Sequence, residues 1–338
     1  MPNNVVIEAI AYELAPHRVT SREIEAQIAP TLGRLKLPPG QLEGLTGIRE
    51  RRFWDAGVMP SDVATIAARR AMQTAGVDPS RVDCLINTSV CKDYIEPSVA
   101  CLVHGNLGLS PGCLNYDIGN ACLGFLNAID IVTMMIETGR IRCGLIVDGE
   151  SAREPVEATI RRLGENGATI DDFRENFATL TLGSGAVAML LRHADDARRQ
   201  HRINGSVNLA ATEYNRLCLG QRDSMKVDPT VLMRAGVELA RKTWLLASRQ
   251  LENWSDAAIA LYAPHQVSVR NTEALVEALG LTREKMFLNV QTLGNIGPAA
   301  LPITLAMAEE AGHLRSGDHV ALMGIGSGLN CTMMSVTW

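Results

Sequence analysis

The chain has 338 residues, of which 46% are hydrophobic and 20% are charged, so it is long enough to bury one large core or two smaller ones. Its formal net charge of −5 provides no broad basic surface, which argues against a nucleic acid partner. The first residues lack the basic region of a signal peptide, and no stretch of about 18 apolar residues occurs, so we expect a cytoplasmic protein without a membrane span.

The first half of the chain alternates predicted strands with predicted helices. Short apolar runs predict strands at Val5–Ala11, Cys84–Val90, Cys143–Asp148 and Ser184–Leu191. A helix is predicted at Ser61–Ala75, with Ser61 as its N-cap and Gly76 just past its end. Residues Cys122–Glu137 predict a second helix, which is apolar on most faces and therefore buried. The charged segment Glu154–Phe177 also predicts helices, either as an insertion near a site or as a solvated connection.

The second half repeats a similar order of elements after a polar linker predicted at His193–Arg202. Strands are predicted at Ile203–Ala211, Ala257–Ala263, His319–Met323 and Cys331–Thr337. Helices are predicted at Asp228–Leu251, where Asp228 is the cap and Pro229 the first helical residue, and at Asn271–Leu279 and Pro298–Gly312. No residue-level repeat relates the halves, yet their common order indicates a duplicated α/β/α architecture with domains 1–192 and 203–338.

Cys122 is the most informative residue, since it lies between small residues at the start of a predicted buried helix. Free N–H groups and the positive end of a helix dipole lower the pKa of a thiol placed there, so we expect a nucleophile. The seven other cysteines show no metal-type spacing, and we expect mostly buried, reduced thiols and no metal. They are Cys84, Cys91, Cys101, Cys113, Cys143, Cys218 and Cys331.

Two later segments supply a histidine and an asparagine. His265 follows a predicted strand, and Asn295 lies in the glycine-rich segment Gly294–Pro298. Each of these two residues alone has an ordinary structural explanation. Cys, His and Asn in this order, however, indicate acyl-thioester chemistry. In such chemistry the neutral His and Asn side chains can donate hydrogen bonds to an enolate oxygen. The Gly-rich segment Gly324–Asn330 precedes a strand, which excludes a dinucleotide or phosphate loop and predicts a tight turn with backbone N–H groups at the site.

Together these motifs resemble the ketoacyl synthase III branch of the thiolase superfamily. The motifs are Asn120–Phe125, His265-Gln266, Gly294–Pro298 and Gly324–Gly328, and they span both halves in family order. The resemblance implies a thiolase-like α/β fold with five α-β-α-β-α layers built from two similar halves. It also implies a homodimer that needs no cofactor and uses coenzyme A thioesters as substrates.

Within that branch the chain most resembles the OleA family, which joins two fatty acyl-CoAs head to head. Supporting segments are Asn87–Ser98, Ala211–Asn215 and Gly324–Asn330. In such enzymes a glutamate reaches the active site of the neighbouring subunit, and Glu96 occupies the matching position. The alternative for Glu96 is a surface residue that precedes Pro97.

The resemblance implies a mechanism in which Cys122 takes the first acyl group and its N–H, with that of Ser327, forms an oxyanion hole. The partner's Glu96 would then deprotonate the second acyl thioester, because condensation without decarboxylation requires a base. His265 and Asn295 would hold the enolate oxygen, and hydrolysis would release a 2-alkyl-3-oxoalkanoic acid.

Two other functions stay open at this point. One is a decarboxylating 3-oxoacyl-[acyl-carrier-protein] synthase III that uses a malonyl thioester and an acyl carrier protein. The other is a support subunit in a heterodimeric condensing enzyme, although such a subunit need not retain all three site residues. Arg49, Arg51 and Arg52 are candidates to bind the phosphates of coenzyme A, and an exposed charge cluster is the alternative. In the family a Trp and an Arg that bind coenzyme A often precede a Thr-Gly-Ile-Arg segment. Here Thr46–Arg49 is present, but Leu42 and Leu45 precede it.

Overall fold

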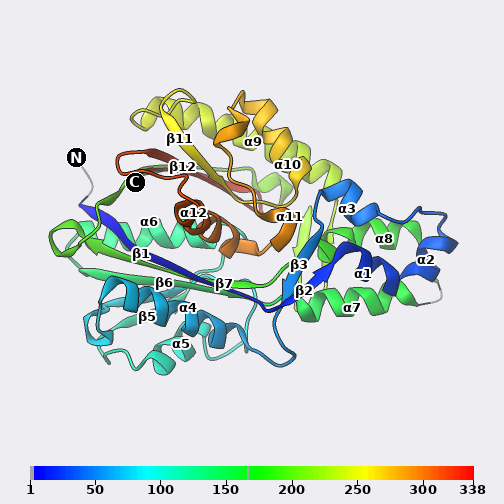
Figure 1. Ribbon diagram of the computed structural model, residues 1–338, viewed down its shortest axis with the longest axis horizontal. Coiled ribbons are helices and arrows are strands. Elements are labelled where there is room, and N and C mark those ends of the chain that lie inside the picture. The colour runs from blue at the N-terminus through cyan, green and yellow to red at the C-terminus, as the bar shows by residue number, and fades with distance from the viewer. Residues whose placement is uncertain (1–3, 166) are drawn as a thin grey trace.

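The computed structural model describes residues 4–165 and 167–338. Within these residues, nine strands form one mixed sheet in the order β11-β12-β13-β8-β1-β7-β6-β4-β5 (Figure 1). The strands are β1 (Val5–Leu14), β4 (Cys84–Asn87), β5 (Leu114–Asp117), β6 (Cys143–Glu150), β7 (Gly185–His193), β8 (His201–Ala210), β11 (Ile259–Pro264), β12 (His319–Gly326) and β13 (Asn330–Thr337). The two halves of the chain meet at β8, because it pairs with β1 on one side and with β13 on the other.

Helices cover both outer faces of the strands and also fill the space between the two halves, which gives five layers (Figure 1). The outer helices are α4 (Pro60–Ala75) and α5 (Val99–Leu107) in the first half, and α9 (Pro229–Gln250) and α10 (Val269–Leu279) in the second. The central layer contains α6 (Gly124–Glu137) and α12 (Ala300–Glu310), whose apolar side chains share one buried core with strands of both halves. The predicted five-layered α-β-α-β-α fold is therefore confirmed.

Most predicted elements are present with shifted ends. The strand predicted at Cys84–Val90 ends at Asn87. Beyond it the backbone leaves the sheet, and the N–H of Val90 donates to the Glu150 carboxylate. β6 in turn runs on to Glu150 and is buried along its whole length, as expected for a strand covered on both faces. The connection between β7 and β8 is shorter than the predicted linker, and a domain boundary at this point stays a prediction.

The start of α4 corrects the predicted cap. The helix begins at Pro60, and the carboxylate of Asp62 accepts the N–H of Met59, the N-cap residue, at 3.2 Å. Ser61 is instead bound by the buried Asp93, which accepts its N–H at 3.0 Å and its hydroxyl at 2.5 Å. A cap from a distant segment cannot be found from local spacing. Gly76 ends the helix in the left-handed conformation, as predicted.

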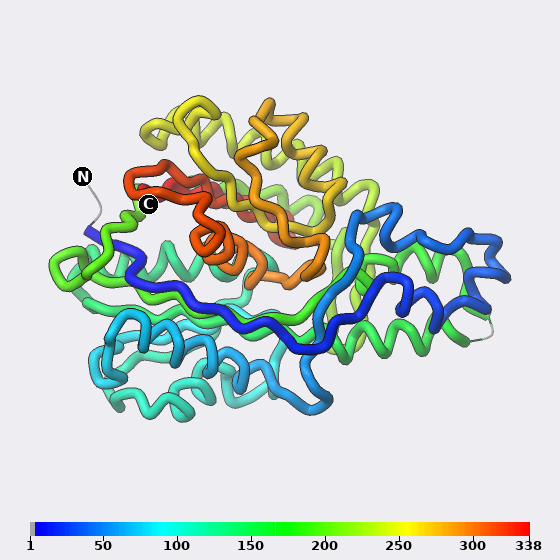
Figure 2. The backbone as a smooth tube through the Cα atoms, viewed as in Figure 1, coloured from blue at the N-terminus to red at the C-terminus, as the bar shows by residue number. Residues whose placement is uncertain are grey.

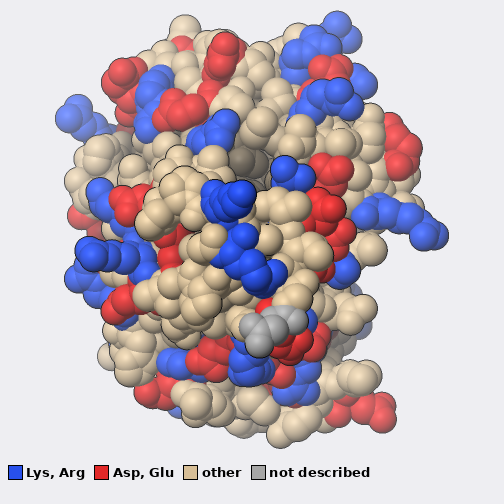
Figure 3. All heavy atoms as spheres, turned by 90° about the vertical axis from the view of Figure 1, so that its right-hand side faces the viewer, with Lys and Arg blue, Asp and Glu red and all other residues tan. Residues whose placement is uncertain are grey.

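A helical lobe that the sequence predicted only in part extends from one end of the layers (Figure 2). Its two segments, far apart in the chain, lie side by side and share a small core of their own. The elements are β2 (His17–Thr20), α1 (Ser21–Gln27), α2 (Ala29–Arg34), α3 (Gln41–Thr46), β3 (Glu50–Phe53), α7 (Arg153–Gly164) and α8 (Ile170–Asn176). Seen from this end of the molecule, Lys and Arg side chains surround a hollow in the face (Figure 3). Of the described helices, none has the length and hydropathy needed to cross a bilayer.

Candidate active site

Cys122 lies on a tight turn between β5 and α6. The helix begins at Gly124, so the thiol precedes its first turn rather than lying within it. Ala121 has φ 46°, a left-handed conformation that costs a residue with a side chain about 1 kcal/mol or more and recurs where a reactive group must be aimed. A Cβ atom on Gly124 would lie 3.2 Å from the carbonyl oxygen of Thr88, so the turn packs directly on the chain that follows β4.

Cys122 is partly exposed as a residue, but its thiol group is enclosed, and this enclosure controls its chemistry. Loss of hydration raises the pKa of Cys122 to about 12, and the nearby Cys218 and Glu150 act in the same direction. The expected lowering of this pKa by the helix is therefore wrong, because desolvation outweighs the dipole of a helix that starts two residues later. The Cys122 thiol is therefore protonated at pH 7.

His265 offers an unpaired imidazole in the interior. It follows β11 directly, and its N–H donates to the carbonyl of Met323 in β12 at 2.8 Å. The side chain is buried, and both ring nitrogens lack a hydrogen-bond partner among the described residues. Burial lowers the pKa of His265 to about 4, so the ring is neutral at pH 7. Buried polar groups are rarely left unpaired, and this pair is available to a ligand.

Gln266 holds the histidine segment in place, a role that the His265-Gln266 motif did not specify. Its side-chain oxygen accepts the N–H groups of Asn289 and Val290 at 3.1 and 3.2 Å. Its amide nitrogen donates to the carbonyl of Phe287 at 3.0 Å and to the hydroxyl of Thr304 at 3.2 Å. All the hydrogen-bonding capacity of this amide is therefore used to fix the segment next to His265.

Asn295 lies on the turn between α11 (Val290–Leu293) and α12. Its N–H donates to Thr181 at 3.0 Å, and its carbonyl accepts the N–H of Gly183 at 2.9 Å. The side-chain oxygen accepts the N–H of Gly297 at 3.0 Å, so the amide nitrogen remains available to donate to a ligand.

Gly183 makes this turn possible. A Cβ atom on Gly183 would lie 1.9 Å from the carbonyl oxygen of Leu293, so Gly183→Ala must displace the backbone beside Asn295. We expect the free energy of unfolding to fall by about 1–3 kcal/mol, measured by urea denaturation. Gly105→Ala is the matched control, because an added Cβ there meets nothing within 4 Å and removing a helical glycine stabilises by about 0.5–1 kcal/mol. Equal stability of the two variants would contradict this account.

The end of β12 brings the separate segments together. A Cβ atom on Gly326 would lie 3.1 Å from the carbonyl oxygen of Asn120, so the turn that contains Ser327 packs against the Cys122 turn. The same strand accepts the N–H of His265. On the other side, a Cβ atom on Gly297 would lie 3.5 Å from the carboxyl carbon of Glu150, whose charge acts on the Cys122 thiol. The thiol, imidazole and amide segments thus converge from both halves of the chain.

Glu96 stands apart from these groups, on an exposed loop between β4 and α5. Its neighbours Tyr94 and Ile95 are also exposed, Ile95 completely. The base of the loop is anchored, because Lys92 forms an ion pair with Asp117 and Asp93 binds Ser61. An anchored loop with apolar side chains at its tip suits insertion into another surface.

Comparison with known proteins agrees with this geometry. The family described as 3-Oxoacyl-[acyl-carrier-protein (ACP)] synthase III matches residues 116–207, and its C-terminal counterpart matches residues 250–338. The Acyl-CoA:acyl-CoA alkyltransferase of Xanthomonas campestris pv. campestris is 43% identical over 335 residues, which cover 99% of each chain. The chain belongs to the OleA family. The Shewanella oneidensis Acyl-CoA:acyl-CoA alkyltransferase is 41% identical over 350 residues, again with 99% of each chain covered.

Solved structures of OleA from Xanthomonas campestris share the fold closely. A cerulenin-bound form has a TM-score of 0.97 at 42% identity, with 100% of this chain and 98% of that chain covered. A Cys→Ser variant with bound lauric acid and lauroyl-CoA has a TM-score of 0.98 at 42% identity, with both chains fully covered. The predicted membership of the ketoacyl synthase III branch and of the OleA family within it is confirmed, and the protein is an acyltransferase of that branch.

The structure corrects one of the three arginines predicted to meet coenzyme A. Arg51 is fully buried and donates to the Ser21 hydroxyl and the Leu180 carbonyl, each at 3.0 Å, so it cannot reach a substrate phosphate. Burial lowers the pKa of Arg51 to about 10, and its hydrogen bonds join β3 to the start of α1 and to Leu180. Arg49 is exposed and Arg52 is partly buried, and their contact with coenzyme A stays a prediction.

Most of the seven other cysteines are buried, as predicted. Four are buried, but Cys91, Cys122 and Cys218 are partly exposed and Cys101 is exposed; all eight are free. Cys218 belongs to β9 (Cys218–Gly220), which pairs with β10 (Met225–Val227). Its position near the Cys122 thiol was not predicted, since only the fold brings the two residues together.

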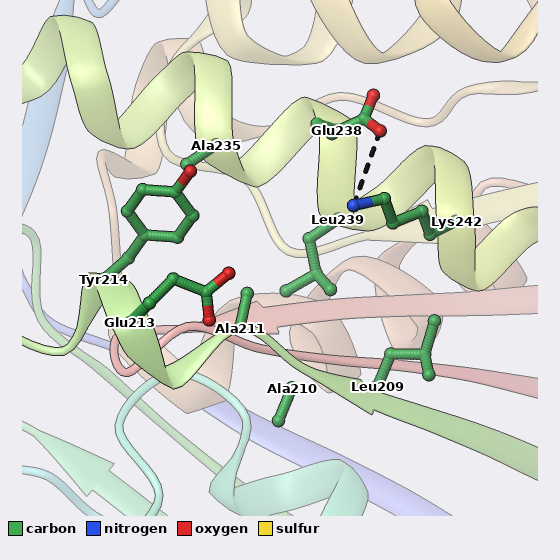
Figure 4. A pocket seen from close by; sticks show the side chains of 9 residues that line it. All are labelled: Leu209, Ala210, Ala211, Glu213, Tyr214, Ala235, Glu238, Leu239 and Lys242. Atoms are coloured by element: carbon green, nitrogen blue, oxygen red, sulfur yellow. Dashed lines mark ion pairs between the residues drawn. The ribbon is translucent and has the colours of Figure 1, made fainter.

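Two adjoining cavities lie at the end of β8. One, of about 190 Å³, contains Tyr214 and Glu213 on one side and the Glu238–Lys242 ion pair on the other (Figure 4). This places the segment Ala211–Asn215, singled out in the sequence, on a cavity wall. The second cavity, of about 320 Å³, lies against the Cys122 turn and is lined by Asn120, Leu123, Asn127, Asn208, Leu209, Ala210, Asn330 and Cys331.

Proposed function

We propose that this protein joins two fatty acyl-CoAs by Claisen condensation without decarboxylation, to give a 2-alkyl-3-oxoalkanoic acid. The observation that carries the proposal is the imidazole of His265, which is buried, neutral and without a hydrogen-bond partner among the described residues. The same site contains the enclosed thiol of Cys122. An imidazole of this kind can donate to an enolate oxygen without first losing or gaining a proton. The reaction needs no cofactor beyond the coenzyme A of its substrates.

In the first half-reaction, the Cys122 sulfur attacks the carbonyl carbon of one acyl-CoA. The thiol proton passes to the departing coenzyme A thiolate, and a thioester on Cys122 results. The N–H groups of Cys122 and Ser327 would stabilise the tetrahedral oxyanion, since the two turns pack together. Because burial keeps the thiol protonated, its proton must leave in the same step in which the sulfur attacks.

In the second half-reaction, the partner's Glu96 removes the α-proton of the second acyl-CoA. The enolate oxygen accepts hydrogen bonds from His265 and from the side-chain nitrogen of Asn295. The enolate carbon attacks the thioester carbonyl, and the bond to the Cys122 sulfur breaks. Water then hydrolyses the β-keto thioester, which releases the acid and the second coenzyme A.

The exposed loop tip supports the assignment of Glu96 to a homodimer partner, and the spacing in the relatives supports the choice of this glutamate. Solved Xanthomonas campestris OleA structures include substitutions of one glutamate, one cysteine and one histidine. That glutamate precedes that cysteine by the same number of positions as Glu96 precedes Cys122. The interval from the cysteine to the histidine differs by one position from the interval between Cys122 and His265.

A second candidate is a decarboxylating synthase, favoured by the description of the matching family as 3-Oxoacyl-[acyl-carrier-protein (ACP)] synthase III. The deciding experiment incubates the purified protein with lauroyl-CoA alone, and separately with added malonyl-CoA or malonyl carrier protein. Products are identified by mass. A 2-alkyl-3-oxo acid from lauroyl-CoA alone establishes the proposed function. Carbon–carbon bond formation only in the presence of a malonyl thioester would establish the decarboxylating reaction instead.

His265→Ala is expected to lower the rate of condensation by about 10²–10³-fold, the usual cost of losing one donor to a developing oxyanion. His265→Asn should lose less, because an amide can still donate. Because burial lowers the pKa of His265 to about 4, the wild-type rate should show no inflection near pH 6.5 from this ring. The check is the steady-state rate of product formation against pH for the three proteins. A fully active His265→Ala variant would remove the imidazole from the mechanism.

A further inference from the structure

Two acidic side chains at the end of β6 are buried beside the site, and the mechanism above uses neither. Asp148 is completely buried, and Glu150 is 5% exposed. Neither forms an ion pair with any described residue, and one Asp148 oxygen lacks a hydrogen-bond partner among them. Burying an unpaired carboxyl group is costly, so its retention calls for a specific role.

The contacts of Glu150 connect two parts of the site. One carboxylate oxygen accepts the N–H of Val90 at 2.6 Å, and the other accepts the N–H of Cys91 at 3.3 Å. These residues begin the loop that carries Glu96. On its opposite side, the carboxyl group lies against the turn that presents Asn295, since a Cβ atom on Gly297 would lie 3.5–3.7 Å from it.

We propose that Glu150 is a positioning residue, which fixes the Glu96 loop relative to the Asn295 turn and is required for condensation but not for loading of Cys122. This inference rests on the proposed function. The first half-reaction uses the Cys122 thiol and the N–H groups of Cys122 and Ser327. Like burial, the charge of Glu150 raises the pKa of that thiol, so its loss in Glu150→Gln does not oppose loading. The second half-reaction requires both structures that Glu150 contacts.

The carboxylate suits this task better than a neutral side chain would. Two backbone N–H groups, those of Val90 and Cys91, point at the side chain, and only a carboxylate offers a separate acceptor oxygen to each of them. In Glu150→Gln one N–H would face the amide NH₂, a donor against a donor, and would be left unpaired. Burial raises the pKa of Glu150 to about 7, and the bonds from Val90 and Cys91 oppose that shift.

The test measures the two half-reactions separately in Glu150→Gln. Loading is followed by intact mass and by coenzyme A release from lauroyl-CoA in a single turnover, and condensation by the 2-alkyl-3-oxo acid formed. We expect loading within about twofold of wild type and condensation lowered by at least about tenfold, the effect of one misplaced group. Glu157→Gln, a partly exposed carboxylate paired with Arg153 on α7, is the matched control and should change neither rate.

Hydrogen–deuterium exchange of residues 90–98 supplies a readout that does not depend on activity. Exchange in this segment should rise at least several-fold in Glu150→Gln and stay unchanged in Glu157→Gln. Unchanged exchange, or equal losses of loading and condensation, would overturn the positioning role. If the wild-type protein does not condense lauroyl-CoA, the proposed function fails, and the exchange result still decides whether Glu150 holds the loop.

Discussion

Replacing Cys122 with alanine is expected to remove the acyl-enzyme and to lower condensation by at least about 10⁴-fold, the scale seen when a covalent nucleophile is lost. This thiol lies on the turn with Ala121 in the left-handed conformation, whereas the nearby Cys218 lies on β9. The measurement is intact mass after incubation with lauroyl-CoA, together with quantification of the 2-alkyl-3-oxo acid.

Two controls test whether the loss is specific to the Cys122 thiol and whether the variant is folded. Cys101→Ala removes an exposed thiol on α5 and should leave both the acyl adduct and the product unchanged. Far-ultraviolet circular dichroism should show that Cys122→Ala folds, since the lost sulfhydryl is replaced by a small apolar group. An undiminished rate of condensation in Cys122→Ala would exclude covalent catalysis at this residue.

The central elements of the fold could be predicted from the sequence because burial leaves a strong local pattern. β6 and α6 are apolar along nearly their whole length, and the pattern alone locates both to within a few residues. β5 was missed because Leu114–Asp117 is short and half-polar, as is typical of a strand at the edge of a sheet. The lobe helices α1 to α3 were missed for a similar reason, because each has seven residues or fewer.

The site could be predicted as a set of motifs but not as an electrostatic environment. Local spacing predicted a lowered pKa for Cys122, whereas burial by distant segments raises it. The same limit explains Arg51, which belongs to a charged segment in the sequence but is enclosed by Ser21 and Leu180 in the fold. Glu150 carried a weak signal, an acidic residue at the end of an apolar strand, which the predicted strand end at Asp148 left out.

Glu96→Ala is expected to separate the two half-reactions more sharply than any other substitution. Condensation should fall by about 10²–10⁴-fold, the contribution of a general base, while loading of Cys122 stays within about twofold of wild type. Rates of coenzyme A release and of product formation from lauroyl-CoA measure the two steps. Glu154→Ala, an exposed carboxylate on α7 paired with Arg222, is the control and should leave both rates unchanged.

Mixed dimers then decide which subunit supplies the base. Cys122→Ala and Glu96→Ala chains are co-expressed with different tags, and the mixed dimer is purified through both tags. This dimer contains one site with an intact thiol and an intact glutamate only if Glu96 acts across the interface. Such dimers should recover about half of the wild-type condensation rate, because one of two symmetric sites is complete. If Glu96 acts within its own chain, both sites are defective and no activity returns. Because Tyr94 and Ile95 extend from an anchored loop into solvent, we expect recovery.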